Sequence, residues 1–305
     1  MLLPRTVLSP AATLFFSVSL ALIVPSTVAV GTEQTDTAKS TSEEPRPNRI
    51  KIEYVPPTNP QHEEIYRHLK ETHALEKVQE IFSPFRLPMD LTVKTVGCDG
   101  QSNAWYLRPT LTLCYEYLDA MWRNAPKEVT PAGITPIDAV VGQYYYVVSH
   151  EMGHAMFDLL DVPFFGHAED VADEFSTFMM LHLGKDQATR LISGAAYSYK
   201  NAVQNPAVIM PLQAFSDVHG TPAQRFYNML CLAYGADPKT FSRVAEDKYL
   251  PQTRAPDCQR EWYQVATSFK RYILPHVDLG LAKQVLNKDW LPPESKKSLQ
   301  DYMHP

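Results

Sequence analysis

The sequence predicts an α+β fold, in which a small sheet of antiparallel type precedes a mostly helical part. Short segments with alternating apolar residues lie before residue 118, and longer segments with apolar residues at helical spacing dominate after residue 134. Strands followed by a run of helices are typical of α+β domains. The 305-residue chain is 45% hydrophobic and 20% charged, so it has enough apolar material for a sizeable core.

The first 29 residues predict a cleaved signal peptide. They combine an early positive charge at Arg5 with an apolar run from Ala11 to Val24, and Thr27 and Ala29 occupy the -3 and -1 positions of a cleavage site. The apolar run is shorter than the roughly twenty residues that a membrane-spanning helix needs. We therefore expect a secreted or periplasmic protein. The alternative is a protein anchored by an uncleaved N-terminal segment.

Residues 30–48 are polar, lack aromatic side chains and include prolines, which predicts a disordered linker. No second linker and no internal repeat follows, so a single domain is expected to cover residues 49–305. No stretch of that domain is long and apolar enough to cross a bilayer. We expect no membrane span once the signal peptide is removed.

The elements of the domain can be placed in order. Alternating apolar residues predict strands at 49–55, 91–96 and 105–117, and Asn59-Pro60 is expected to cap a helix that runs through residues 65–82. Thr135 as N-cap and Pro136 at the first helical position predict a long apolar helix that ends near residue 160. Residues 169–183 form the next predicted helix. Three or four more are expected to start near Gln187, Thr221, Asp257 and Ser295.

The long helix contains the motif HExxH, within residues 149–160 (SHEMGHAMFDLL). His150 and His154 are four residues apart, so both imidazoles project from one face of the helix and can bind one metal ion. Glu151 projects from the same end and can accept a proton from a metal-activated water. The pattern therefore predicts a catalytic zinc site, for which the apolar helix is a suitable buried setting.

A catalytic zinc site needs a third protein ligand. The candidates after His154 are His167, Glu169, Asp170, Asp173 and Glu174. The metzincin arrangement is excluded because position 157 is Phe and position 160 is Leu. The ligand is therefore expected on the next helix.

Helical spacing divides that helix into two faces. Val171, Phe175, Phe178 and His182 form a stripe that should face the core. Glu169, Ala172, Asp173 and Ser176 share the other face, where the small Ala172 and Ser176 would allow close approach to the HExxH helix. Either Glu169 or Asp173 can bind the metal while the other accepts the spare N–H of a ligand histidine. The alternative is that these acids are only solvated charges of the first helical turns.

HExxH followed by Glu169-x-x-x-Asp173 resembles the glutamate zincins, a group of metallopeptidases. The resemblance implies that Glu169 is the third zinc ligand and that Asp173 buttresses a histidine. Glu174 does not fit the pattern, because position 178 is Phe. The chain also resembles a bacterial family called putative metallopeptidase, domain of unknown function 4344, in this motif region and three others taken together: CDGQSNAWY…LTLCYEY, HEMGHAMFD…EDVADEF, HGTPAQRFYNMLC…YGADP and RAPDC. That resemblance covers most of residues 50–275 and implies a zincin-like domain.

Two other residues are candidates for contact with a substrate. Asn103 precedes Ala104 and Trp105 in a predicted edge strand, and a similar Asn-Ala segment binds the substrate backbone in thermolysin-like enzymes; alternatively, Asn103 is a polar turn residue. A peptidase also needs a donor for the developing oxyanion, and His219, in a loop before a helix, is the first candidate. His219 can instead be an ordinary loop histidine, and Arg225 can form a buried ion pair.

The four cysteines form two local pairs, separated by 16 and 27 residues. In an exported protein this predicts the disulfides Cys98–Cys114 and Cys231–Cys258. A four-cysteine zinc site would need closely spaced C-x-x-C pairs, which the sequence lacks.

These observations favour a secreted or periplasmic Zn2+-dependent peptidase that acts on peptides or proteins, with Glu151 as general base. A degenerate zincin that keeps the metal but serves as a binding module is the alternative, although such a module has no need of Glu151. A deformylase would need an upstream cysteine ligand, and the cysteines are better explained as disulfides. The net charge of -6 and the lack of a long basic run argue against nucleic acid as a partner. The sequence indicates no oligomeric state.

Overall fold

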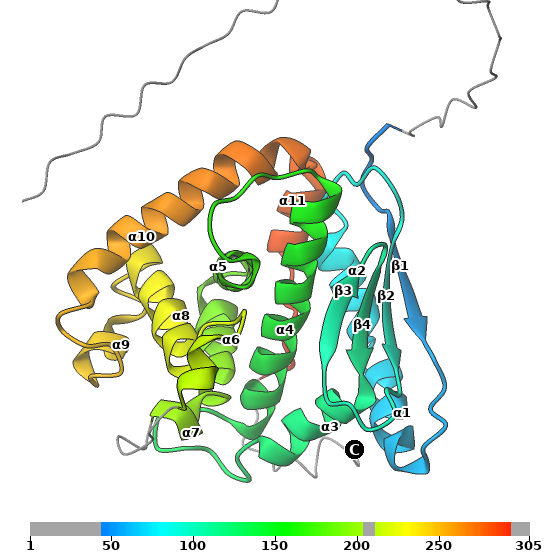
Figure 1. Cartoon of the computed structure of the whole chain (residues 1–305), viewed down its shortest axis with the longest axis horizontal. Helices are drawn as coiled ribbons and strands as arrows, with labels where there is room; N and C mark the ends of the chain where they lie inside the picture. Colours follow the sequence, from blue (N-terminus) through cyan, green and yellow to red (C-terminus); the bar gives the residue numbers. More distant parts are fainter. Residues whose placement is uncertain (1–43, 204–210, 294–305) are drawn as a thin grey trace, which may run out of the picture. The chain divides into compact units, whose positions relative to one another are not determined.

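A computed structural model describes residues 44–203 and 211–293 of the chain. The predicted signal peptide, most of the predicted linker and the helix expected near Ser295 lie outside the described residues. In the described part, a small sheet is followed by a mostly helical portion, as predicted (Figure 1).

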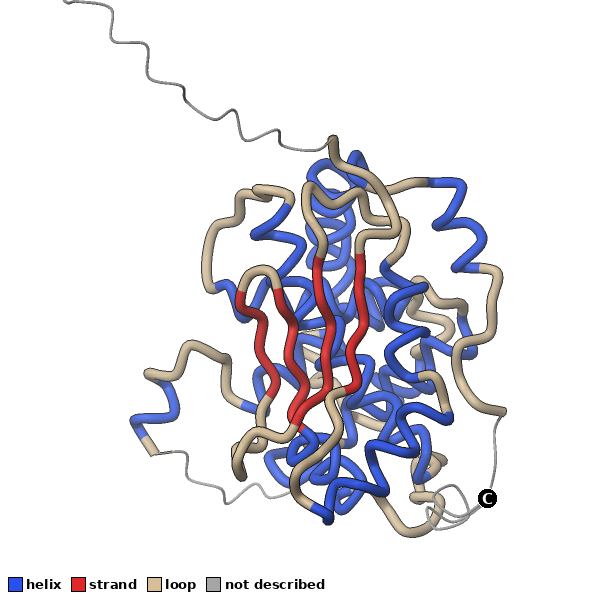
Figure 2. Tube along the Cα trace, turned by 90° about the vertical axis from the view of Figure 1, so that its right-hand side faces the viewer, coloured by secondary structure: helices blue, strands red, loops and turns tan. Residues whose placement is uncertain are grey.

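The sheet is mixed, so the expected antiparallel type is wrong. It contains β1 (Ile50–Tyr54), β2 (Leu91–Val96), β3 (Ala104–Leu107) and β4 (Thr110–Cys114), in the order β1-β2-β4-β3 (Figure 2). β1 pairs with β2 in parallel, because two helices intervene and return the chain to the same end. β3 and β4 form an antiparallel hairpin that inserts β4 beside β2, also in parallel. β3 is thereby left at the edge of the sheet.

Two predicted boundaries are wrong. The helix expected over residues 65–82 is divided into α1 (Glu63–Glu71) and α2 (Ala74–Phe82), because His73 adopts a left-handed conformation with φ 53°. The strand expected to reach residue 117 ends at Cys114, and α3 (Tyr115–Asn124) begins directly after it. Its buried residues Tyr115, Leu118 and Met121 recur every three positions, which is helical spacing.

The predicted long helix is α4 (Pro136–Leu159), and its N-cap is confirmed: the Thr135 side chain accepts a hydrogen bond from the backbone N–H of Asp138. α4 lies between the sheet and the later helices (Figure 1). α5 (Ala168–Leu181) and α6 (Lys185–Tyr197) pack against it. On α5, Phe175 and Phe178 of the predicted core-facing stripe are buried.

The remaining helices are α7 (Lys200–Val203), α8 (Pro222–Ala236), α9 (Ser242–Glu246), α10 (Ala255–Ser268) and α11 (Leu279–Leu286). α8 and α10 begin near the predicted positions, whereas α7, α9 and α11 were not predicted. Short 3-10 turns occupy Pro60–His62, Leu212–Phe215 and Leu274–His276, and a π-helical turn occupies Phe269–Ile273. No helix among the described residues is long and apolar enough to cross a membrane.

Both predicted disulfides are present. Cys98–Cys114 links the chain just after β2 to the end of β4, and Cys231–Cys258 links α8 to α10. Disulfides of this kind persist in oxidising compartments, so the structure indicates an extracellular type of environment.

The crossing of α4 and α6 leaves no room for side chains at its centre. A Cβ at Gly142 would lie 2.6 Å from the backbone of Leu191 and Ala195, and a Cβ at Gly194 would overlap the Asp138 carbonyl oxygen. We predict that Gly194→Ala lowers the free energy of unfolding by about 3 kcal/mol, because the helices must separate. Ser193→Ala, in the same helix, should change it by no more than about 0.5 kcal/mol. Denaturant unfolding would measure both, and equal effects would contradict the role of this crossing.

Candidate metal centre

α4 carries both histidines of the motif. His150 and His154 lie one turn apart, and their Nε2 atoms are 3.2 Å from each other. The His150 side chain is only 4% exposed, whereas that of His154 is 21% exposed. The helix therefore presents two imidazole nitrogens at one point, as the motif predicts.

α5 approaches this part of α4 closely because the contact is made by small residues. A Cβ added at Gly153 would lie 3.3 Å from the Cα of Ala172. Ala172 and Ser176 are fully buried, and the Ser176 hydroxyl donates a hydrogen bond to the Tyr146 carbonyl oxygen at 2.7 Å. The close approach expected from the small-residue face of this helix is thus confirmed.

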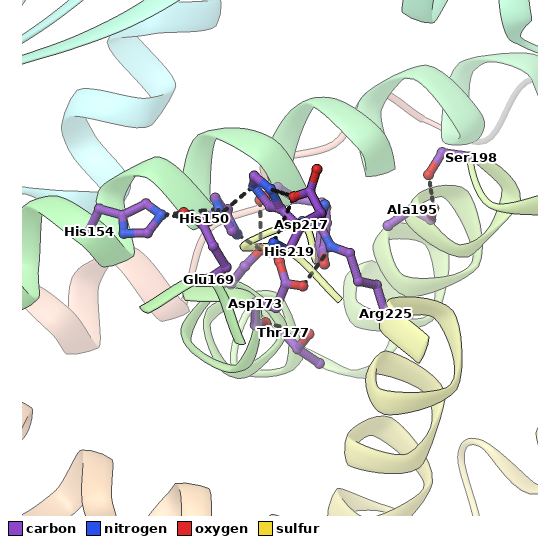
Figure 3. A network of polar contacts seen from close by, with 12 residues as sticks. His150, His154, Glu169, Asp173, Thr177, Ala195, Ser198, Asp217, His219 and Arg225 are labelled. Carbon is purple, nitrogen blue, oxygen red and sulfur yellow. Dashed lines mark hydrogen bonds and ion pairs between the residues drawn. The ribbon is translucent and has the colours of Figure 1, made fainter. Parts of the chain in front are cut away.

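Glu169 lies on the first turn of α5 and reaches the two histidines (Figure 3). Its Oε2 atom is 3.0 Å from the Nε2 atom of His150 and 3.3 Å from that of His154. The hydrogen bond with His150 is the main cause that lowers the pKa of Glu169, to about 2. Glu169 is therefore an anionic oxygen donor beside two imidazole nitrogens.

The separations of these donor atoms fit a metal ion. Tetrahedral Zn2+, with ligands at about 2.0–2.1 Å, has donor atoms roughly 3.3 Å apart. The three measured separations among His150, His154 and Glu169 are 3.0, 3.2 and 3.3 Å. Imidazole nitrogen and carboxylate oxygen are also ligand atoms that zinc binds in proteins. The residues present can therefore hold this metal.

Asp173 lies one turn after Glu169 and contacts the other nitrogen of His150. The Asp173 Oδ1 atom is 2.7 Å from His150 Nδ1, and Arg225 on α8 donates to both carboxylate oxygens at 2.7 Å. Burial would raise the pKa of Asp173, but its hydrogen bonds with His150 and Arg225 hold it at about 2. Likewise, burial would lower the pKa of His150, but Asp173 and Glu169 raise it to about 9. Asp173 and Glu169 thus contact the two ring nitrogens of His150.

Glu151, next to His150 in the motif, is also buried and is 7% exposed. Burial raises its pKa, while His150 acts in the opposite direction. The backbone of Tyr106, on β3, hydrogen-bonds to the Glu151 carboxylate. Glu151 therefore lies between the metal-binding group and the edge strand.

These residues line one cleft of about 1160 Å³. His150, Glu151, His154 and Glu169 lie along it, together with the edge strand β3 from Asn103 to Arg108. The predicted candidates Asn103 and His219 also line the cleft, as does Arg225, which forms an ion pair with Asp173. The structure thus brings the predicted ligands, the predicted base and both substrate-contact candidates to one cleft, with Asp173 behind His150.

Sequence reasoning missed a contact that links the edge strand to α4. Asp158 accepts hydrogen bonds from the Tyr106 hydroxyl and from Arg108, each at 2.7 Å. Asp158 lies four residues after His154, on the same face of α4, and that spacing is the signal that could have revealed it.

The comparison with protein families gives one result. The model of a family described as Putative metallopeptidase matches residues 54–273, which is more than half of the chain. No curated protein and no solved structure matches the chain.

Glu174, the rejected ligand candidate, provides a test of the electrostatics of α5. Burial is the main cause that raises its pKa from 4.5 to about 7, followed by Asp170 and Glu261. A raised folded-state pKa gives stability that is fully present below the unfolded pKa and is lost as the pH rises through 7. We predict that Glu174→Gln raises the free energy of unfolding by about 2 kcal/mol at pH 8 and has little effect at pH 4.5.

Denaturant unfolding at the two pH values would measure this difference. Glu246→Gln, at an exposed position of α9, is the matched control. It should change the free energy of unfolding by the same amount at both pH values. An effect of Glu174→Gln that does not depend on pH would contradict the prediction.

Proposed function

The chain belongs to the Putative metallopeptidase family, and we propose that it is a secreted or periplasmic zinc-dependent peptidase with a zincin-like domain. The observation that carries the proposal is the convergence of His150, His154 and Glu169 on one point beside the buried Glu151. The two disulfides support an oxidising compartment.

His150, His154 and Glu169 would hold Zn2+, and Asp173 would orient His150. When bound, zinc would supply Lewis acidity to the scissile carbonyl and lower the pKa of a water. Three protein ligands leave a position open, as a catalytic zinc site requires.

Glu151 would be the general base. Its carboxylate lies in the cleft beside the ligands, and burial raises its pKa, which makes it a stronger base than an exposed glutamate. It would accept a proton from the attacking water and pass that proton to the leaving amine. Glu151 needs no bond to the metal for this role.

The edge strand β3 would hold the substrate backbone. The Asn103 carbonyl accepts from the Cys114 N–H, so alternate residues of β3 pair with β4. The backbone N–H and C=O groups of Ala104 and Tyr106 then point away from β4, towards the open edge of the sheet. An extended peptide could pair with Ala104 and with the carbonyl of Tyr106, and it would pass Glu151, which accepts the Tyr106 N–H. Asn103 would contact the same backbone, and His219 would donate a hydrogen bond to the developing oxyanion.

Glu151→Gln tests the proposed base. We predict that it leaves zinc content and folding nearly unchanged, because Glu151 is not a ligand. Hydrolysis should fall by about a hundredfold to ten-thousandfold, since an amide cannot accept the proton. Cleavage of a diverse peptide library by the zinc-loaded proteins, with metal analysis by plasma mass spectrometry, measures both quantities. Equal cleavage would point to a contaminant, and no cleavage by the wild type would favour the binding-module alternative.

Glu169→Gln tests the third ligand. We predict about one zinc per wild-type chain and a marked loss of zinc in Glu169→Gln, because an amide is a poor replacement for the anionic donor. Glu174→Gln changes the same group on the same helix and should keep its zinc. If Glu174→Gln loses the metal while Glu169→Gln retains it, the ligand assignment is wrong.

A further inference from the structure

We propose that His219 is a fourth, displaceable protein donor of the metal centre when no substrate is bound. This inference rests on the proposed function, because it concerns the same zinc site. It places His219 on the metal before a substrate binds, in addition to the hydrogen bond that His219 is proposed to donate to the oxyanion.

The geometry brings His219 to the ligand group. Its Nε2 atom is 2.8 Å from Glu169 Oε2, the oxygen that also lies beside both histidines of α4. The ligand atoms of His150, Glu169 and His219 all lie within 4.8 Å of one another. The rings of His150 and His219 are nearly parallel, with 23° between their planes. His219 thus directs its Nε2 atom at the Glu169 oxygen that contacts both histidines of α4 (Figure 3).

The other nitrogen of His219 has the partner that a metal-ligating histidine usually has. His219 Nδ1 is 3.1 Å from Asp217 Oδ1, and the same oxygen accepts the backbone N–H of His219 at 2.9 Å. A carboxylate on one imidazole nitrogen fixes the ring and leaves the opposite nitrogen available to a metal. The pair repeats the relation between Asp173 and His150 on the other side of the site.

Four protein donors would close the site, and a peptidase needs it open. Closed four-coordinate sites are typical of structural zinc, whereas catalytic zinc keeps one position free. The buried Glu151 beside the ligands has no use in a permanently closed site. One donor must therefore be able to leave.

His219 is the donor that can leave without disturbing the core. It is 42% exposed, against 4% for His150, and no residue from Pro211 to Gly220 is buried. His150 and His154 belong to the central helix α4, whereas the segment 211–220 leads into α8 at the buried Thr221. Segments with few buried contacts open at low free-energy cost. A substrate carbonyl oxygen would take the position of His219, and the released imidazole would remain close enough to donate a hydrogen bond to it.

Metal binding by the full mature protein tests the donor role. The variants are His219→Ala and the control His167→Ala, which removes an exposed histidine that does not line the cleft. Competition with a chromophoric chelator should show that His219→Ala raises the Kd for Zn2+ at least about tenfold. The absorption spectrum of the Co2+-loaded protein should change as well. The control should match the wild type, and an unchanged Kd and spectrum in His219→Ala would overturn the proposal.

Acetohydroxamate, a metal-chelating carbonyl compound, tests the displacement. Acetohydroxamate must displace the His219 imidazole from the metal in the wild type, whereas His219→Ala has no imidazole to displace. Its affinity for the Co2+-loaded variant should therefore be several-fold higher than its affinity for the Co2+-loaded wild type. A histidine that only donates a hydrogen bond predicts the opposite order. Equal or weaker binding by the variant would therefore overturn displacement. None of these measurements uses hydrolysis, so an inactive protein would count against the peptidase proposal alone.

Discussion

The contact between α4 and α5 is the constraint on which the candidate site depends. Glu169 and Asp173 reach His150 only because the two helices approach closely at Gly153 and Ala172. A larger side chain at either position would press the two helices apart, and with them the carboxylates and imidazoles that they carry. The small residues therefore have a chemical consequence: they set the distance between donors from two different helices.

The same contact buries a charged side chain, which then needs a partner of opposite charge. Asp173 is largely buried, and an unpaired carboxylate there would be costly. Arg225 provides the partner from α8, and its guanidinium lies over the rings of Tyr146 and Tyr199. A planar, bidentate donor suits this position better than a lysine would. The orientation of His150 is therefore fixed by residues from three helices.

Local features of the structure could be predicted from the sequence, because they depend on neighbouring residues. The start of α4 follows from Thr135 and Pro136, and the pairing of cysteines follows from their spacing and the expected compartment. The clustering of Glu169 with the histidines could be anticipated from helical phase and the resemblance to the glutamate zincins. Parallel pairing of β4 with β2 could not, because it depends on where a hairpin inserts into the sheet. The break at His73 was also hidden, since the apolar spacing continues on both sides of it.

The two walls of the cleft differ in how they are held, and this difference bears on how a substrate could enter. On one side, β3 is linked to α4 through Asp158 and is bonded to β4, whose last residue Cys114 forms a disulfide. On the other side, the segment that carries His219 is exposed, and its His219 imidazole contacts Glu169. A substrate backbone would therefore pair with the fixed strand β3, which sets its register, and would lie against the exposed segment that carries His219, which can move. Movement of that segment alone would leave the positions of the donors on α4 and α5 unchanged, and also the orientation of the His150 ring.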